Sequence, residues 1–215
     1  MMQRKTFSLE IRDDGADVFR SALKKMWPEL TRALEESGAS NFSLWQAGWL
    51  VFGYYEMEGQ NGFSLKFALK NCFDRYAAGT FSWISDPASQ MRLMYSNIGI
   101  VREEKNLIRH RVFMTKLKGS VENEYRRRHK ALEDARGSEP DPGPDSNFTI
   151  WSAGGYIFGY DEIDTTMETD MTAEDRRKTI AWETNMLGIM DWITDDVDWI
   201  TGARHEHVKR LAWYR

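Results

Sequence analysis

The chain contains two copies of one sixteen-residue pattern, and this internal repeat constrains the fold more than any other feature. Residues 41–56 (NFSLWQAGWLVFGYYE) and 147–162 (NFTIWSAGGYIFGYDE) are identical at nine of sixteen positions. The offset is 106 residues, close to half of the 215-residue chain. The same register extends upstream without a gap, because Phe7 aligns with Phe113. Similarity over this length predicts a duplicated structural unit.

In the first copy the hydrophobic pattern predicts a strand, a helix, two strands, a helix and a strand. Residues 5–11 alternate as in a strand, and apolar residues then recur at the helical period from Val18 to Leu34. Residues 41–57 predict a hairpin that turns at a glycine. A long helix is expected over about residues 62–85, and residues 91–98 (MRLMYSNI) are expected to close the unit.

The second copy repeats this order. Residues 109–116 predict a strand, and a helix is expected from about Ser120. A hairpin over residues 147–163 follows, and Thr172 opens another helix with an acidic residue three positions later, as in a capping box. Residues 207–214 (HVKRLAWY) are expected to form the last strand.

A βαββαβ unit forms an antiparallel sheet with helices on one face and leaves its other face in need of cover. We therefore predict an α+β protein with two ferredoxin-like repeats, residues 1–105 and 106–215. The two sheets are expected to join into a pseudo-twofold dimeric α/β-barrel. A single chain, as a monomeric pseudo-dimer or within a homodimer, would then achieve what two separate subunits do.

The composition indicates a folded globular protein. Hydrophobic residues make up 41% of the chain and aromatic residues 13%, enough for a packed core. A net charge of −4 and an isoelectric point near 5.7 favour neither nucleic acid nor an anionic membrane as a partner. The single cysteine, Cys72, cannot form an internal disulfide, and no apolar run is long enough to span a bilayer. We expect a cytoplasmic protein with a small-molecule substrate.

The two copies differ at one pair of helix positions. At the offset of 106, Tyr125 and His129 align with Phe19 and Leu23, which lie on the apolar stripe of the first helix. Residues four positions apart share one face of a helix. A buried polar group without a partner costs about 1–3 kcal/mol. A neighbouring side chain, water or a ligand must therefore satisfy the phenol and the imidazole.

Two further differences lie nearby. Asp161 replaces Tyr55 on a strand face that is otherwise apolar. The second copy also changes to GSEPDPGPDS at residues 137–146, and these prolines end the helix early. The resulting loop is either a route for a ligand or an ordinary variable connection.

His129 is the residue here that can both give and take a proton near neutral pH. Opening and reclosing a sugar ring requires such a group, because the anomeric hydroxyl loses a proton while the ring oxygen gains one. Tyr125 could orient a sugar hydroxyl. Asp161 could pair with the imidazole or accept a hydrogen bond from substrate.

Flat apolar side chains are expected around these polar groups. Phe148 and Trp151 from the hairpin, and Trp182 from the last helix, could pack against the C–H groups of a sugar. His205 and His207 could share one side of an extended segment, but the spacing offers no third metal ligand. A helix-borne Tyr/His pair remains compatible with a structural role.

These segments resemble the L-rhamnose mutarotases. The family carries a Glu-Tyr-x-x-Arg-His segment that leads into Trp-Pro-Glu-Leu, followed by a Gly-Ala-His-Asn-Tyr strand. In this chain EYRRRHKAL lies in the second copy at residues 124–132, and WPEL lies in the first copy at residues 27–30. The resemblance implies a ferredoxin-like fold that dimerises through its sheets, and activity without a cofactor or metal.

The resemblance also implies roles for individual residues. His129 matches the proton donor and Tyr125 a substrate-binding tyrosine. Phe148 occupies the position of a sugar-contacting tyrosine and lacks its hydroxyl. The family's tryptophan pair on the second helix falls near Thr184 and Asn185.

The sequence leaves three functions open. The first is an aldose mutarotase-like enzyme, acting on L-rhamnose or a similar sugar, with one site in the second repeat and a structural first repeat. The second is a cofactor-independent cyclase or monooxygenase of the dimeric α/β-barrel kind, acting on a larger aromatic molecule. The third is a binder without catalytic activity.

Overall fold

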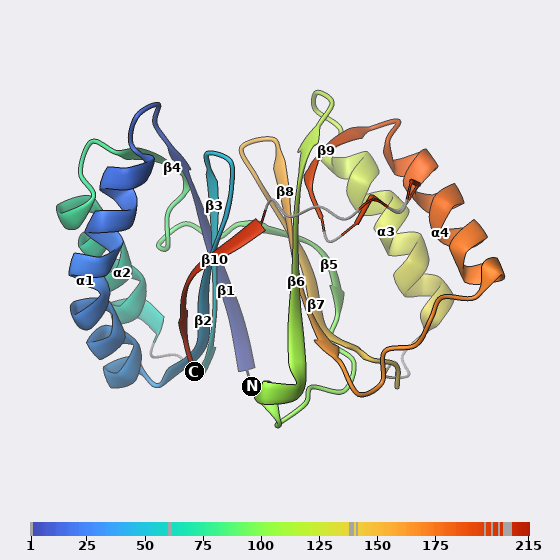
Figure 1. Ribbon diagram of the computed structural model, residues 1–215, viewed down its shortest axis with the longest axis horizontal. Coiled ribbons are helices and arrows are strands. Elements are labelled where there is room, and N and C mark those ends of the chain that lie inside the picture. Colours follow the sequence, from blue (N-terminus) through green and yellow to red (C-terminus); the bar gives the residue numbers. More distant parts are fainter. Residues whose placement is uncertain are drawn as a thin grey trace. The chain divides into compact units, whose positions relative to one another are not determined.

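The computed structural model is an α+β protein with four α-helices and two five-stranded antiparallel sheets in its described part (Figure 1). This confirms the predicted fold class and the duplicated unit. The described residues are 2–59, 62–137, 140, 142–195, 197–198, 200–201, 203 and 208–215. His205 and His207 lie outside them.

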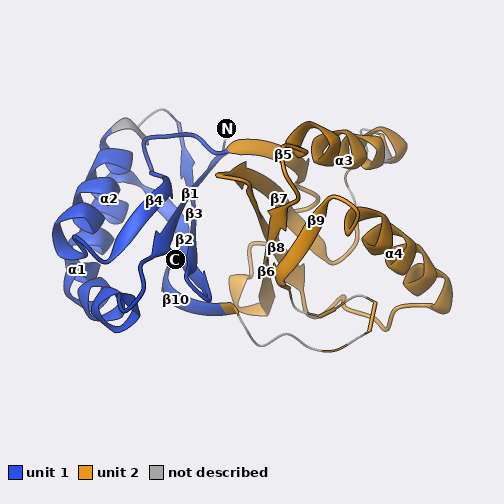
Figure 2. Cartoon of the chain, turned by 90° about the horizontal axis from the view of Figure 1, so that it is seen from above, with its two compact units in different colours: residues 1–91, 209–215 blue, residues 92–208 orange. Residues whose placement is uncertain are grey.

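The chain divides into two compact units, shown in different colours in Figure 2. Unit 1 comprises residues 1–91 and 209–215, and unit 2 comprises residues 92–208. The predicted packing of one sheet against the other concerns the relation between the units and stays a prediction.

Unit 1 has its helices on one face of its sheet (Figure 1). Its strand order is β10-β2-β3-β1-β4. Its elements are β1 (Met2–Ile11), α1 (Ala16–Ser37), β2 (Ala39–Ala47), β3 (Leu50–Glu58), α2 (Gly62–Tyr76), β4 (Phe81–Ser85) and β10 (Val208–Tyr214).

Unit 2 repeats this arrangement with the strand order β5-β7-β8-β6-β9. The Thr172 hydroxyl caps its last helix by accepting a hydrogen bond from the Asp175 amide, at 3.1 Å, as the capping-box pattern predicts. Its elements are β5 (Arg92–Asn97), the short 3-10 helix η1 (Lys105–Leu107), β6 (Ile108–Leu117), α3 (Glu122–Arg136), β7 (Asp145–Ala153), β8 (Tyr156–Asp164), α4 (Ala173–Met186) and β9 (Met190–Thr194).

The expected closing strand of each repeat belongs to the other sheet. β5 follows the first repeat in sequence but pairs with β7 of unit 2, and β10 lies beside β2 of unit 1. The prediction that each repeat closes its own sheet with this strand is therefore wrong. The predicted boundary between residues 105 and 106 separates the two sequence repeats. The compact units differ from the repeats because β5 belongs to the sheet of unit 2 and β10 to the sheet of unit 1.

A second correction concerns residues 62–85, predicted as one helix. The helix ends at Tyr76, and residues 81–85 form β4, which pairs with β1. Gly79 between them has φ +79, a left-handed conformation that interrupts a helix. After it, Phe81 and Trp83 alternate onto the face of the sheet that packs in the core.

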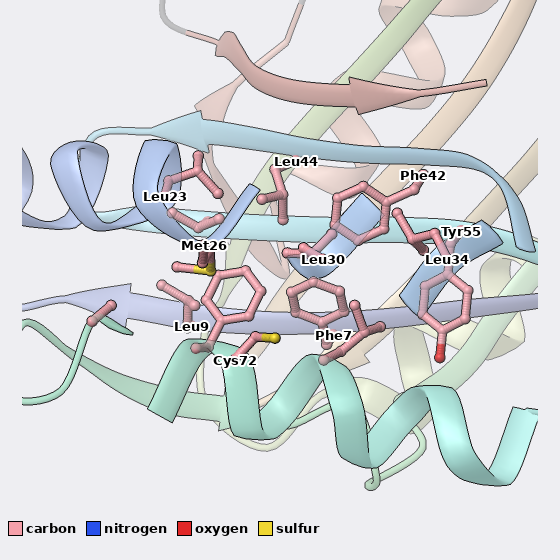
Figure 3. Packing of buried hydrophobic residues seen from close by; sticks show 14 of the residues in the cluster. Phe7, Leu9, Leu23, Met26, Leu30, Leu34, Phe42, Leu44, Tyr55 and Cys72 are labelled. Carbon is pink, nitrogen blue, oxygen red and sulfur yellow. The ribbon is translucent and has the colours of Figure 1, made fainter. Parts of the chain in front are cut away.

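The core of unit 1 lies between its sheet and its helices (Figure 3). From α1, Leu23, Met26, Leu30 and Leu34 point toward the sheet, where they pack with residues such as Phe7. All of these side chains are buried, so α1 covers its face of the sheet with apolar side chains along most of its length.

A glycine on β3 accommodates a phenylalanine on β1 in unit 1, and a glycine on β8 accommodates one on β6 in unit 2. A Cβ atom at Gly53 would lie 2.2 Å from Phe7 Cζ, and one at Gly159 would lie 2.0 Å from Phe113 Cε1. The register pairs the same residues across the ladder. Both phenylalanine rings therefore lie against the glycine opposite them, and this shared contact is consistent with the duplication.

None of the helices in the described part of the chain combines the length and the apolar composition needed to cross a membrane.

Candidate active site

Unit 2 contains a cavity of about 250 Å³ between its two helices and its sheet. Four of the six residues predicted for the site line it: Tyr125 and His129 from α3, Phe148 from β7 and Trp182 from α4. The site is thus built from both helices and from the sheet face that they cover.

Tyr125 and His129 form a stacked pair on the inner face of α3. Their ring centroids lie 4.3 Å apart with an interplanar angle of 22°. The His129 Nδ1 atom lies 3.1 Å from the backbone carbonyl oxygen of Tyr125. Because a carbonyl oxygen can only accept a hydrogen bond, Nδ1 carries the hydrogen. In the neutral ring the Nε2 atom is then the unprotonated nitrogen.

Burial controls the protonation of this pair. His129 is 5% exposed, and burial lowers the pKa of its imidazole from 6.5 to about 4. The hydrogen bond to the Tyr125 carbonyl opposes this change but does not cancel it. Burial also raises the pKa of the Tyr125 phenol. At neutral pH the cavity therefore presents a neutral imidazole and a protonated phenol.

Aromatic rings surround His129. The Trp182 ring meets the imidazole edge to face, with centroids 5.2 Å apart, and the Tyr95 ring lies 5.4 Å away. The Phe148 ring packs on Tyr95 at 5.3 Å. These walls offer flat apolar faces to a ligand and hold the imidazole in place.

A buried carboxyl group, Glu183, also lines the cavity. It is 7% exposed, and its Oε2 atom has no hydrogen-bond partner among the described residues. Burial raises the pKa of this carboxyl from 4.5 to about 7, although the guanidinium of Arg111 and a hydrogen bond from Trp192 favour the charged form. Glu183 can therefore hold or release a proton near neutral pH.

Arg111 lines the cavity as one half of an ion pair. Its Nε and Nη2 atoms donate to the two carboxylate oxygens of Asp195, at 2.9 and 2.6 Å. The guanidinium also lies 5.1 Å from the Phe113 ring centroid. Paired in this way, Arg111 brings a fixed positive charge to the polar side of the cavity.

The other two predicted site residues do not line this cavity. Trp151 follows Ile150, which lines the cavity, and adjacent residues of a strand point to opposite faces. Asp161 is buried, and burial together with nearby Asp145 raises the pKa of its carboxyl well above the usual range. Asp161 is therefore a buried acid that does not belong to the cavity lining.

A family model described as L-rhamnose mutarotase matches residues 4–75 of this chain. This part of the chain is therefore similar to an L-rhamnose mutarotase domain. The comparisons found no match among curated proteins or solved structures.

The mutarotase match runs from β1 to the end of α2, and so it falls in unit 1 rather than around the cavity of unit 2. In unit 1, Phe19 and Leu23 occupy the positions of Tyr125 and His129, and both are buried in the core. The repeat thus carries the matched sequence in one unit and the polar pair in the other.

The first helix of the repeat is longer in unit 1 than in unit 2. In unit 1, α1 has 22 residues, and Leu30 and Leu34 in its second half pack in the core over the sheet. α3 has 15 residues and ends at Arg136, before the proline-rich loop. At the offset of 106, α3 ends at the position equivalent to Leu30, and the position equivalent to Leu34 lies beyond the helix.

The repeat contained a signal for Glu183 that the sequence prediction missed. Beyond the hairpin the offset between the copies is 109, which aligns Glu183 with Asp74 and Trp192 with Trp83. Trp83 Nε1 donates to Asp74 Oδ1 at 2.8 Å, and Trp192 makes the equivalent hydrogen bond to Glu183. Tyr95 had no such signal, because its strand was assigned to the other sheet.

Proposed function

We propose that unit 2 interconverts the anomers of a free aldose, such as L-rhamnose, by opening and reclosing the sugar ring. The observation that carries this proposal is the buried His129 imidazole, held with Nδ1 as donor and Nε2 available beside a cavity. The family match of residues 4–75 supports the same class of reaction, an isomerisation.

The reaction needs two proton transfers. His129 Nε2 takes the proton of the anomeric hydroxyl while the bond between C1 and the ring oxygen breaks, and the ring oxygen gains a proton. The aldehyde rotates about its bond to C2, and the reverse transfers close the ring on the other face. Tyr125 donates a hydrogen bond to a sugar hydroxyl.

The dimensions of the cavity favour a small substrate. Pockets for drug-sized ligands occupy about 300–1,000 Å³. At about 250 Å³ the cavity lies below that range and suits a monosaccharide better than a polycyclic compound. Its mixture of aromatic walls with an imidazole, a phenol and a carboxyl matches the apolar faces and hydroxyl groups of a sugar.

A second candidate is a reaction on, or the binding of, an aromatic small molecule. The aromatic lining favours it, since Tyr95, Phe113 and Trp192 add to the rings of Phe148 and Trp182. Such a ligand would be detected as an absorbing compound that is released on denaturing the purified protein.

Saturation-transfer NMR on a panel of free aldoses tests the first proposal. The protein should accelerate the exchange between α and β anomers of at least one aldose above the rate in buffer. The methyl glycoside of the same sugar is the control, because it cannot open and should show no exchange. Buffer-rate exchange for every aldose would contradict the proposal.

A further inference from the structure

We propose that Glu183 is the second catalytic residue of this site, the group that exchanges a proton with the ring oxygen while His129 serves the anomeric hydroxyl. This inference rests on the proposed function and names a residue outside the Tyr/His segment. The cavity lining of unit 2 supports this role, and the equivalent position of unit 1, Asp74, provides a comparison.

The geometry places an acid where the reaction needs one. Glu183 and His129 line the same cavity from facing helices, and the Glu183 Oε2 atom is buried without a partner among the described residues. A buried polar atom without a partner costs free energy, so a ligand hydrogen bond here would be favourable. The indole of Trp192 donates a hydrogen bond that fixes the carboxyl group.

In unit 1 the equivalent carboxylate forms an ion pair with a lysine. Asp74 accepts a hydrogen bond from Trp83 and forms an ion pair with Lys70, one helical turn earlier. In unit 2 the residue one turn before Glu183 is Thr179, which also lines the cavity. Unit 2 therefore also has the indole beside its carboxyl group. This carboxyl group is buried, and no lysine stands one turn earlier to favour its ionised form.

The protons balance with this assignment. On ring opening, protonated Glu183 gives its proton to the ring oxygen as the C1–O bond breaks, and neutral His129 takes the anomeric proton. The intermediate state holds a glutamate anion, an imidazolium and the open aldehyde. On ring closure the imidazolium returns its proton to the aldehyde oxygen, and the carboxylate takes the hydroxyl proton.

The test compares anomer exchange across pH in the full chain and its variants. Wild-type exchange should fall above about pH 7, where Glu183 loses its proton. Glu183→Gln should lower kcat/KM about 10²–10⁴-fold, the usual contribution of a general acid or base, and abolish this alkaline decline. Glu174→Gln, an exposed carboxylate on the same helix, should leave the rate unchanged.

A second pair of variants tests the ionisation of the Glu183 carboxyl group directly. Thr179→Lys restores the lysine of unit 1, and Thr179→Gln is the uncharged control. Carbon-13 NMR of the Glu183 carboxyl, assigned by its loss in Glu183→Gln, should show ionisation at a lower pH in Thr179→Lys alone.

Three outcomes distinguish the role of Glu183 from the proposed function of unit 2. Wild-type exchange that survives Glu183→Gln with an unchanged pH profile overturns the role of Glu183 but leaves the proposed function standing. A Glu183 carboxyl that is already ionised at pH 5 also overturns it. Absence of wild-type exchange on every aldose overturns the proposed function and the inference with it.

Discussion

The ring of His129 stacks on the ring of Tyr125 at 4.3 Å, and its Nδ1 atom lies 3.1 Å from the Tyr125 carbonyl oxygen. One residue thus holds the imidazole both by its side chain and by its backbone. This double contact fixes the tautomer and the orientation that the proposed proton transfer requires.

Removing the Tyr125 hydroxyl should affect the sugar more than the fold. Tyr125→Phe keeps the ring that stacks on His129 and deletes the hydrogen-bond donor. Since such a bond contributes about 0.5–1.5 kcal/mol, we expect kcat/KM to fall roughly 2- to 13-fold. The circular dichroism spectrum should be unchanged. A fall of several hundredfold would instead make Tyr125 a proton-transfer group.

Replacing His129 with the leucine found in unit 1 should stabilise the protein in acid. The unfolded chain takes up the histidine proton near pH 6.5 and the folded chain near pH 4, so wild-type stability decreases as the pH falls between these values. His129→Leu removes this loss of about 3 kcal/mol. Urea unfolding at pH 4.5 and 7.5 should show an advantage of the variant that grows in acid. An advantage independent of pH would contradict the assigned burial.

Glu183 should have the opposite dependence. The folded carboxyl stays protonated up to about pH 7, whereas the unfolded one ionises near pH 4.5, so stability decreases as the pH rises through this range. Glu183→Gln should be more stable than wild type at pH 8, by up to about 3 kcal/mol, and the difference should shrink toward pH 4.5. Urea unfolding of Glu174→Gln provides the comparison with an exposed carboxylate.

The glycine beneath Phe113 should tolerate no side chain. A Cβ atom at Gly159 would lie 2.0 Å from Phe113 Cε1, so Gly159→Ala should lower the free energy of unfolding by about 1–3 kcal/mol or more. Adding Phe113→Leu should recover part of this loss, because the two changes share one contact. Strictly additive effects in thermal unfolding would show that the ring does not lie over this glycine.

Much of the architecture could be predicted because the repeat supplies its own comparison. The repeat predicts an inward helix face for Tyr125 and His129, because their counterparts Phe19 and Leu23 follow the apolar period. The choice of partner for β5 could not be predicted, since an edge strand has the same local pattern in either sheet. Tyr95 was missed for this reason.

Two details of the site depended on register. Phe148 and Ile150 line the cavity, and Trp151 lies one residue further along the strand, so its side chain points to the other face. The sequence prediction placed Phe148 and Trp151 in one site, although residues three positions apart point to opposite faces of a regular strand. Glu183 aligns with another acid, Asp74, so the two copies show no change of residue class that would mark this position.

The rate of anomer exchange in a His129→Gln variant tests the central claim most directly. His110→Gln is the matched control, because His110 lies on β6 and does not line the cavity. Saturation-transfer NMR with an aldose that the wild type accelerates should show buffer-rate exchange for His129→Gln and wild-type exchange for His110→Gln. Accelerated exchange that persists in His129→Gln would contradict the assignment of the reaction to the cavity of unit 2.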